Sequence, residues 1–381
     1  MKLAELDTPT LILDRARLQA NTARMSARAR ALGVDLRPHM KTAKCAEVAK
    51  LATAGHSGGI TVSTLKEAEY FAGHGFRDIT YAVGIVPAKL ERAAALRRAG
   101  VRLSVVTDNL EVARALGPRA KDLDVDFEVM IEVDTGDGRA GVAPESEDLI
   151  ALGRALGQAP GVSLRGVLTH LGKSYGCREV AEIAALAEEE RSGAVRAAER
   201  LRAAGLSCPV VSVGSTPTAI HAKSLEGVTE MRPGVFVFQD VMQAEIGSCT
   251  MSDIAVSVLA TVTGQHPERG EIVIDAGGLA LSKDRSTAAA PRDIGYGLVV
   301  DALCGEDLPE MHVTQVSQEH GIVRAANGAQ LPYDRLRPGT QVRVLPNHAC
   351  FTAAAYADYR VVDSSGVPDQ LVATWPRVNG W

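Results

Sequence analysis

Segments with the pattern of a strand alternate with segments with the pattern of a helix between residues 10 and 240. This alternation favours a parallel sheet, because a chain leaving one parallel strand needs a crossover, usually a helix, to enter the next. About eight units follow one another, and eight units close a (β/α)8 barrel. We therefore predict an α/β fold built on a TIM barrel. The expected strands are 34–37, 59–63, 79–83, 102–106, 127–133, 164–170, 210–213 and 227–231, and the clearest helices are 14–33, 42–54, 65–73, 87–99, 110–116 and 179–204.

Beyond residue 245 the pattern changes to short β-rich runs separated by Gly, Pro and Asn. Long helical patterns are absent from this part, which is typical of an all-β domain. The expected strands are 255–263, 271–275, 312–316, 321–324, 341–345 and 359–362. With 46% hydrophobic residues, 23% charged residues and a net charge of −5, the chain has the composition of a soluble globular protein. It lacks the basic surface typical of nucleic-acid-binding proteins.

The cysteines are spaced irregularly, without the close spacings of a disulfide framework. The N-terminus lacks the pattern of a signal peptide, and no segment approaches the roughly 20 uncharged apolar residues that span a bilayer. We therefore expect a cytoplasmic protein with reduced thiols and no membrane partner. The six cysteines are Cys45, Cys177, Cys208, Cys249, Cys304 and Cys350.

A histidine and a lysine follow the first predicted barrel strand, in the run Arg37-Pro38-His39-Met40-Lys41-Thr42. Barrel enzymes carry their reactive groups where the strands end. An amine at that place can bond covalently to a carbonyl group, as in Schiff-base chemistry. A surface lysine beside a proline turn would give the same pattern.

Two further runs also follow predicted barrel strands. In the first, Glu132 to Val142, a strand enters a loop with three glycines, and we expect its Arg139 to be buried. A turn with a surface arginine would give the same pattern. The second, Ser212 to Thr218, places small hydroxyl residues and Gly214 after a strand, where backbone N–H groups and hydroxyls can hold a phosphate. Arg232-Pro233-Gly234 could form a second wall of that site.

The β-rich part contains the run Leu345-Pro346-Asn347-His348-Ala349-Cys350. On a strand, residues i and i+2 point to the same face, so His348 and Cys350 could bind one metal ion. Two protein ligands would leave coordination positions open for water or substrate. A buried cysteine beside a hydrogen-bonded histidine would give the same pattern.

Together these runs resemble the fold-type III pyridoxal-phosphate enzymes of the D-serine dehydratase / D-threonine aldolase family. The resemblance extends over essentially the whole chain. It is carried by Asp7-Thr8-Pro9, Arg37 to Thr42, Gly59 to Glu69, Val211 to Thr218, Asp275-Ala276-Gly277, Gln318 to Gly321 and Pro346 to Cys350. It implies an alanine racemase-like barrel followed by an all-β domain. The domain limits that we expect are 14–245 for the barrel and 246–381 for the β domain, with 1–13 as a strand segment joining the β domain.

The resemblance also implies roles for individual residues. Lys41 would bind pyridoxal 5′-phosphate covalently and later remove the α-proton. Arg139 would hydrogen-bond the phenolic oxygen of the cofactor, and His170 would lie against its ring. Gly214, Ser215, Thr216 and Gly234 would hold the phosphate. His348 and Cys350 would bind a divalent metal, with zinc favoured by the thiolate and manganese or magnesium as alternatives.

The implied reaction is dehydration of a D-3-hydroxy amino acid, D-threo-3-hydroxyaspartate or D-serine, to a 2-oxo acid and ammonia. Family members that cleave D-threonine carry H-x-D where this chain has H-x-C, and tend to have Asp where it has Gln318. The alternative is a D-threonine or 3-hydroxy-D-aspartate aldolase, which would give glycine and an aldehyde or glyoxylate. An amino-acid racemase would need a second base, such as Tyr296 or Tyr356, and has no need of the metal pair.

Relatives of this kind are homodimers, so we expect a head-to-tail homodimer. We also expect Tyr175, Ser282 and Arg285 to contact the substrate. A second substrate carboxylate would need such an arginine or hydroxyl donors. By contrast, we expect the charge run Glu188-Glu189-Glu190-Arg191 to be a solvated helix face.

Overall fold

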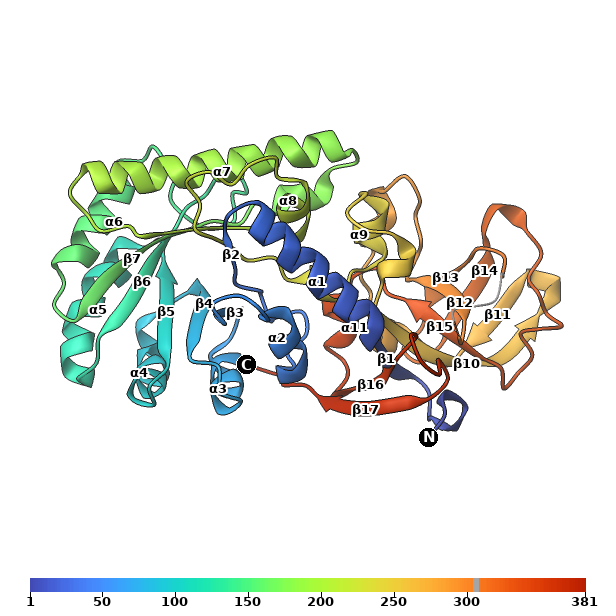
Figure 1. Ribbon diagram of the computed structural model, residues 1–381. Coiled ribbons are helices and arrows are strands. Elements are labelled where there is room, and N and C mark those ends of the chain that lie inside the picture. Colours follow the sequence, from blue (N-terminus) through green and yellow to red (C-terminus); the bar gives the residue numbers. More distant parts are fainter. Residues whose placement is uncertain (304–307) are drawn as a thin grey trace. The chain divides into compact units, whose positions relative to one another are not determined.

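The predicted barrel is present, and its eight strands are all parallel (Figure 1). The order is β2-β9-β8-β7-β6-β5-β4-β3, and the backbone after β2 pairs with β3 through His39 and Thr61, which links the two ends of the sheet. The computed structural model describes residues 1–303 and 308–381. The strands are β2 (Asp35–Leu36), β3 (Ile60–Val62), β4 (Asp78–Gly84), β5 (Arg102–Thr107), β6 (Phe127–Glu132), β7 (Val162–Leu168), β8 (Val210–Val213) and β9 (Glu230–Met231).

The chain divides into two units. Ala23–Gly234 with Gly380–Trp381 form the first, called here the barrel unit, and Met1–Thr22 with Val235–Asn379 form the second, called the β unit. In the barrel unit, helices lie outside the strands (Figure 1). They are α2 (Ala46–Ala52), α3 (Leu65–Gly73), α4 (Leu90–Arg98), α5 (Leu110–Leu123), α6 (Glu147–Gln158), α7 (Val180–Ala203) and α8 (Thr216–His221), together with the later part of α1 (Arg15–Ala31).

Local signals in the sequence explain where α1 begins and ends. Asp14 Oδ1 accepts hydrogen bonds from the N–H groups of Ala16 (3.0 Å) and Arg17 (3.3 Å), as an N-cap does. Gly33 ends the helix with φ +70°, a conformation that glycine adopts without the steric cost of a side chain.

The N-terminal end of the barrel interior is filled by ion pairs. The buried Arg37 guanidinium contacts Asp78 at 2.9 Å and Glu230 at 2.8 Å. Arg165 contacts Asp78 from the other side at 3.4 Å. A Cβ at Gly59 would lie 2.4 Å from Arg37 Nη1, so only glycine leaves room for this guanidinium.

The β unit contains a sheet of nine strands in the order β11-β14-β13-β12-β15-β10-β1-β16-β17, and β10 also pairs with β11. Six of these strands therefore form a closed ring, which is extended from β10 by β1, β16 and β17. All pairs are antiparallel except β1 with β16. The strands are β1 (Thr10–Asp14), β10 (Val256–His266), β11 (Glu271–Ile274), β12 (Leu298–Asp301), β13 (Met311–Val316), β14 (Gly321–Ala325), β15 (Gln341–Leu345), β16 (Asp358–Val362) and β17 (Leu371–Pro376), and the short helices are α9 (Val241–Glu245), α10 (Gly278–Leu281) and α11 (Ala349–Ala353).

Some local predictions differ from the structure. The helix expected at 42–54 begins only at Ala46, because Lys44 adopts a left-handed backbone conformation with φ 48°. The helix α6 and the strands β12 and β17 were not expected. Cys45, Cys177, Cys208, Cys249 and Cys350 form no disulfide bond, and Cys304 lies outside the described residues. Among the described residues, no helix has the length and apolar character needed to cross a membrane.

Candidate active site

A cavity of about 380 Å³ lies at the C-terminal ends of the barrel strands. It brings together four predicted site residues: Lys41, Arg139 and Gly214, which come from three separate runs, and His170, which the family resemblance implies. These residues lie up to 173 positions apart in the chain, and only the closure of the barrel makes them neighbours. The other lining residues are His39, Ser63, Ala82, Val83, Gly84, Glu132, Ala140, Leu168 and Arg232.

An ion pair with a buried carboxylate holds the loop that carries Lys41. Lys44 Nζ lies 3.3 Å from the buried carboxylate of Glu67 on α3. The other oxygen of Glu67 accepts the N–H of Ser63 at 2.9 Å, and Ser63 lines the cavity. Since a lysine at φ 48° is strained, the surrounding contacts must fix this loop. Lys41 N–H donates to His39 Nδ1 at 3.4 Å.

The histidines of the cavity are held in the neutral state. Burial, together with the positive charges of Lys41 and Arg139, lowers the pKa of His170 to about 3. Burial and the same lysine also lower the pKa of His39 well below its usual value. His170 Nδ1 lies 2.8 Å from the carbonyl oxygen of Gly214, so this nitrogen carries the proton.

The loop after β8 is held in one conformation by its neighbours. Gly214 has φ +132°, and a Cβ there would lie 2.8 Å from the backbone nitrogen of Arg232. Ser215 caps α8: its Oγ accepts the N–H of Thr218 at 3.2 Å, and its own N–H donates to Thr218 Oγ1 at 3.0 Å. Ser215 and Thr216, which follow Gly214 in the chain, are buried.

Gly234 approaches the loop that carries Lys41. A Cβ at Gly234 would lie 3.0 Å from the carbonyl oxygen of His39 and 3.2 Å from Thr42 Oγ1. A larger residue would displace that loop, so this position favours glycine.

The buried guanidinium of Arg232 also lines the cavity. It donates to Ser212 Oγ and, at 2.5 Å, to the carbonyl oxygen of Thr169. Burial lowers the pKa of Arg232 to about 10, although Glu230 and Glu190 oppose this effect. The guanidinium therefore remains charged at neutral pH and gives the cavity a fixed positive charge.

The expectation that Arg139 is buried is wrong. Its side chain is 59% exposed, and its Nη2 lies 3.9 Å from Glu132. The glycine-rich loop is organised instead by Asp134, whose carboxylate accepts the N–H groups of Gly136 (2.8 Å) and Asp137 (2.7 Å). Arg139 nevertheless lines the cavity.

The second group of predicted residues lies in the β unit. The side chains of His348 and Cys350 are hydrogen-bonded to each other. Burial disfavours a charged imidazole, but Cys350 and the carboxylates of Asp240 and Asp284 outweigh burial and raise the pKa of His348 to about 9. An imidazole and a thiol in contact are donors that suit zinc. The described residues contain no group of three or more side chains able to hold a metal ion.

The placement of this pair on a strand is wrong. The strand β15 ends at Leu345, His348 is the N-cap of α11, and Cys350 lies in the first turn of that helix. Asp240 fixes this turn, since it accepts the N–H of Ala349 at 3.0 Å. The two side chains therefore meet through a helix start, and not through the alternation of a strand.

The predicted substrate residues are divided between the units. Tyr175 lies in the barrel unit, with its ring centroid 6.5 Å from that of His170. Ser282 and Arg285 lie in the β unit, where Arg285 contacts Asp293 at 2.5 Å and the ring of Tyr296 at 5.1 Å. The buried Asn347 ties this loop to the start of α11, because its Nδ2 donates to the carbonyl oxygens of Asp284 (3.2 Å) and Gly295 (2.6 Å).

Sequence reasoning missed the buried acidic residues that support these loops, namely Glu67, Glu190 and Asp240. Acidic residues in helices usually face solvent, so nothing in the local pattern of Glu190 separates it from a surface residue. Glu67 and Asp240 do carry a weak signal, since each stands at the start of a short helix.

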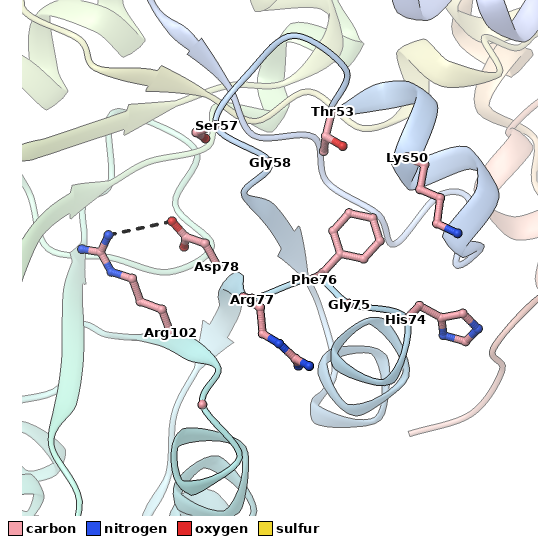
Figure 2. Close-up of a pocket in the computed structure, with 11 residues that line it drawn as sticks. Lys50, Thr53, Ser57, Gly58, His74, Gly75, Phe76, Arg77, Asp78 and Arg102 are labelled. Atoms are coloured by element: carbon pink, nitrogen blue, oxygen red, sulfur yellow. Dashed lines mark ion pairs between the residues drawn. The ribbon is translucent and has the colours of Figure 1, made fainter.

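A larger cavity, of about 720 Å³, lies at the opposite end of the strands (Figure 2). Asp78 and Arg102 begin β4 and β5, and their ion pair of 3.9 Å lies along this cavity. None of the predicted site residues lines it. The C-terminal end of a barrel is where these folds place their chemistry, so the smaller cavity is the candidate active site.

Comparison with known proteins agrees with this fold. Residues 13–241 match the model of the alanine racemase N-terminal domain, and residues 255–362 match that of a putative serine dehydratase domain. D-threo-3-hydroxyaspartate dehydratase from Delftia sp. (strain HT23) is 48% identical, covering 100% of this chain and 99% of that protein. Its solved structure has a TM-score of 0.95 at 47% identity and covers 100% of both chains.

Two more distant relatives are named for other activities. D-serine dehydratase from Dictyostelium discoideum is 34% identical over 99% of this chain and 98% of that protein. D-threonine aldolase from Arthrobacter sp. is 31% identical over 97% and 92%, respectively. Two solved variants of D-threo-3-hydroxyaspartate dehydratase replace a histidine and a cysteine two positions apart, and the cysteine variant is described as metal-free. The matches extend from end to end, and this chain belongs to the D-serine dehydratase / D-threonine aldolase family of alanine racemase-like enzymes.

Proposed function

We propose that this protein is a lyase that uses pyridoxal 5′-phosphate and a divalent metal to dehydrate D-3-hydroxy amino acids. The substrate would be D-threo-3-hydroxyaspartate or D-serine, and the products a 2-oxo acid and ammonia. The observation that carries the proposal is the meeting of Lys41, His170 and Gly214 in one cavity, in a chain 48% identical to a D-threo-3-hydroxyaspartate dehydratase.

The residues of the cavity fit the proposed cofactor. Pyridoxal phosphate, when bound, withdraws electrons from the α-carbon of an amino acid. Lys41 would bind it covalently and, once released by the substrate amine, would take the α-proton. Arg139 would pair with the phenolic oxygen, and the neutral His170 would lie against the ring. Gly214, Ser215, Thr216 and Gly234 would hold the phosphate. These residues come from the loops after β8 and β9, and each loop has one position, Gly214 or Gly234, where neighbouring atoms leave little room for a Cβ.

His348 and Cys350 would hold the metal, which would act as a Lewis acid on the β-hydroxyl group of the substrate. Their soft thiol and imidazole donors favour zinc over manganese or magnesium. The metal-free cysteine variant of a D-threo-3-hydroxyaspartate dehydratase supports this role, because the histidine and the cysteine replaced in the two solved variants have the same spacing as His348 and Cys350. Tyr175, Ser282 and Arg285 are proposed to contact the substrate.

A product assay tests the reaction. The purified protein, supplied with pyridoxal phosphate and zinc, is incubated separately with D-threo-3-hydroxyaspartate, D-serine and D-threonine. We expect oxaloacetate or pyruvate together with an equal amount of ammonia. Glycine with glyoxylate or acetaldehyde, and no ammonia, would overturn the dehydratase assignment.

Glycine and an aldehyde as products would support the alternative function, an aldolase. The aldolase alternative is favoured by the 31% identity to a D-threonine aldolase along almost the whole chain. Against it stand Gln318 and the thiol of Cys350, at positions where we expect the aldolases to carry carboxylates. We also propose that the protein is a head-to-tail homodimer in the cytoplasm. Its proposed domain limits are 1–13 for the strand segment, 14–245 for the barrel and 246–381 for the β domain.

A further inference from the structure

One residue of the acidic run on α7 does not face solvent. Glu188 and Arg191 form the expected surface ion pair, at 2.6 Å. Glu190, between them, is 1% exposed. The prediction that this whole run is solvated is therefore wrong for Glu190, whose carboxyl group points into the barrel unit.

The carboxylate of Glu190 joins two loops of the candidate active site. Its Oε1 accepts the N–H of Leu171 at 2.9 Å and the N–H of Gly214 at 3.3 Å. The side chain of Thr218 also hydrogen-bonds to it. Leu171 directly follows His170, and Gly214 directly precedes Ser215. One oxygen atom thus connects the loop of the proposed ring-stacking histidine with the loop of the proposed phosphate site.

A further hydrogen bond closes this connection into a ring of contacts. His170 Nδ1 donates to the carbonyl oxygen of Gly214 at 2.8 Å, so Gly214 is held through both its carbonyl and its amide. Any shift of Glu190 would therefore move the His170 side chain and the Gly214 backbone together.

The carboxylate of Glu190 is closely packed. The space between α7 and these loops is lined by residues that include Ala187, Ala219 and Ala222, and no volume is left there for a water molecule beside the carboxylate. An apolar residue of similar size at position 190 would leave two buried N–H groups unpaired, at a cost comparable to two lost hydrogen bonds. Burial raises the pKa of Glu190. Burying an ionised carboxylate costs free energy, which the hydrogen bonds of Glu190 must offset.

We propose that Glu190 is a positioning residue that fixes the His170 and Gly214 loops in the geometry that binds the cofactor phosphate. This inference rests on the proposed function, since it concerns the same cofactor. It assigns Glu190 no contact with the cofactor or the substrate.

The test measures cofactor affinity directly, and not only activity. The protein is stripped of cofactor and titrated with pyridoxal phosphate, followed by the visible absorbance of the bound cofactor and by the phosphorus NMR shift of its phosphate. Five variants are compared with the natural protein, one of them Glu189→Ala at an exposed neighbouring position. Glu190→Ala removes both acceptor contacts, Glu190→Asp keeps the charge but shortens the reach, Glu190→Gln keeps an acceptor oxygen, and Leu201→Ala removes buried volume further along α7.

For Glu190→Ala and Glu190→Asp we expect the dissociation constant to rise about tenfold or more, with an altered phosphorus shift; tenfold corresponds to 1.4 kcal/mol. For Glu190→Gln the constant should stay within about threefold of the natural value. Glu189→Ala, an exposed neighbour, should change nothing. If Glu190→Ala does not fold, Glu190→Asp carries the test.

Three outcomes would overturn the inference. Unchanged affinity in Glu190→Asp and Glu190→Ala would show that the contacts do not position the phosphate. An equal loss in Leu201→Ala would show a general effect of stability. Failure of Glu190→Gln to restore affinity would show that the acceptor geometry is not what matters. If the natural protein itself bound no pyridoxal phosphate, the proposed function would fall, and this inference with it.

Discussion

His170 and Gly214 are joined by a hydrogen bond of 2.8 Å between the imidazole Nδ1 and the carbonyl oxygen. This bond links the segments that follow β7 and β8. It also fixes the proton on Nδ1, so the other ring nitrogen carries none while the ring is neutral. Burial beside Lys41 and Arg139 keeps the ring neutral, with a pKa of about 3.

The low pKa of His170 predicts an acid-sensitive fold. In the unfolded chain a histidine takes up a proton near pH 6.5, whereas in the folded protein His170 does so only near pH 3. Between these values the unfolded state binds more protons, so the free energy of unfolding should fall as the pH falls, by about 1.4 kcal/mol per pH unit for this residue. Denaturant unfolding of the cofactor-free protein between pH 7 and pH 4 measures the slope.

His170→Gln supplies the control for that measurement. Glutamine can donate a similar hydrogen bond but does not titrate, so the slope should decrease by about one proton. His39, whose pKa is also lowered, accounts for a second proton by the same reasoning. A slope that is the same in His170→Gln and the natural protein would contradict the assignment.

The sequence was sufficient for the architecture because eight βα units and a change to short β runs are long-range patterns. It also indicated that Lys41, Arg139 and Gly214 would lie close together, since each follows a barrel strand and strand ends converge. His170, which lines the same cavity, was named only by the family resemblance. The sequence did not reveal which polar side chains are buried. Glu190 looks like a surface residue because its neighbours Glu188 and Arg191 are, and only the packing of α7 shows otherwise. Likewise, the turn that joins His348 to Cys350 depends on Asp240, more than a hundred residues away.

The ion pairs of Arg37 predict a large loss of stability on its removal. Arg37→Ala would leave Asp78 and the buried Glu230 without their main cation. Breaking a buried pair by removing one partner costs about 3–5 kcal/mol. Chemical denaturation followed by circular dichroism measures this loss. Arg92→Ala is the matched control, because its pair with Glu69 is about half exposed, at 46% and 45%, and should change stability by less than about 1 kcal/mol. Similar losses in both variants would contradict the role of the buried pair.

The proposed role of Lys41 predicts a spectroscopic change. Lys41→Ala should lose the visible absorbance band of lysine-bound cofactor, and reduction with borohydride should no longer attach the cofactor to the chain. Lys66→Ala serves as the control, since Lys66 is an exposed lysine on α3 and does not line the cavity. A Lys41→Ala protein that keeps the band would rule out Lys41 as the covalent residue.

The contact between His348 and Cys350 predicts where the metal binds. Removing either donor leaves a single protein ligand, and one ligand cannot hold a divalent ion against water at micromolar concentration. Atomic emission of dialysed protein should therefore show bound metal in the natural chain and little in His348→Ala or Cys350→Ala. Cys249→Ala, which changes a thiol elsewhere in the β unit, should keep the metal.

Chelation with EDTA should abolish product formation while the cofactor absorbance remains, because the proposed cofactor residues all lie in the barrel unit. Full turnover after verified removal of the metal would refute its role in the reaction, whereas metal retained in Cys350→Ala would refute only the choice of ligands.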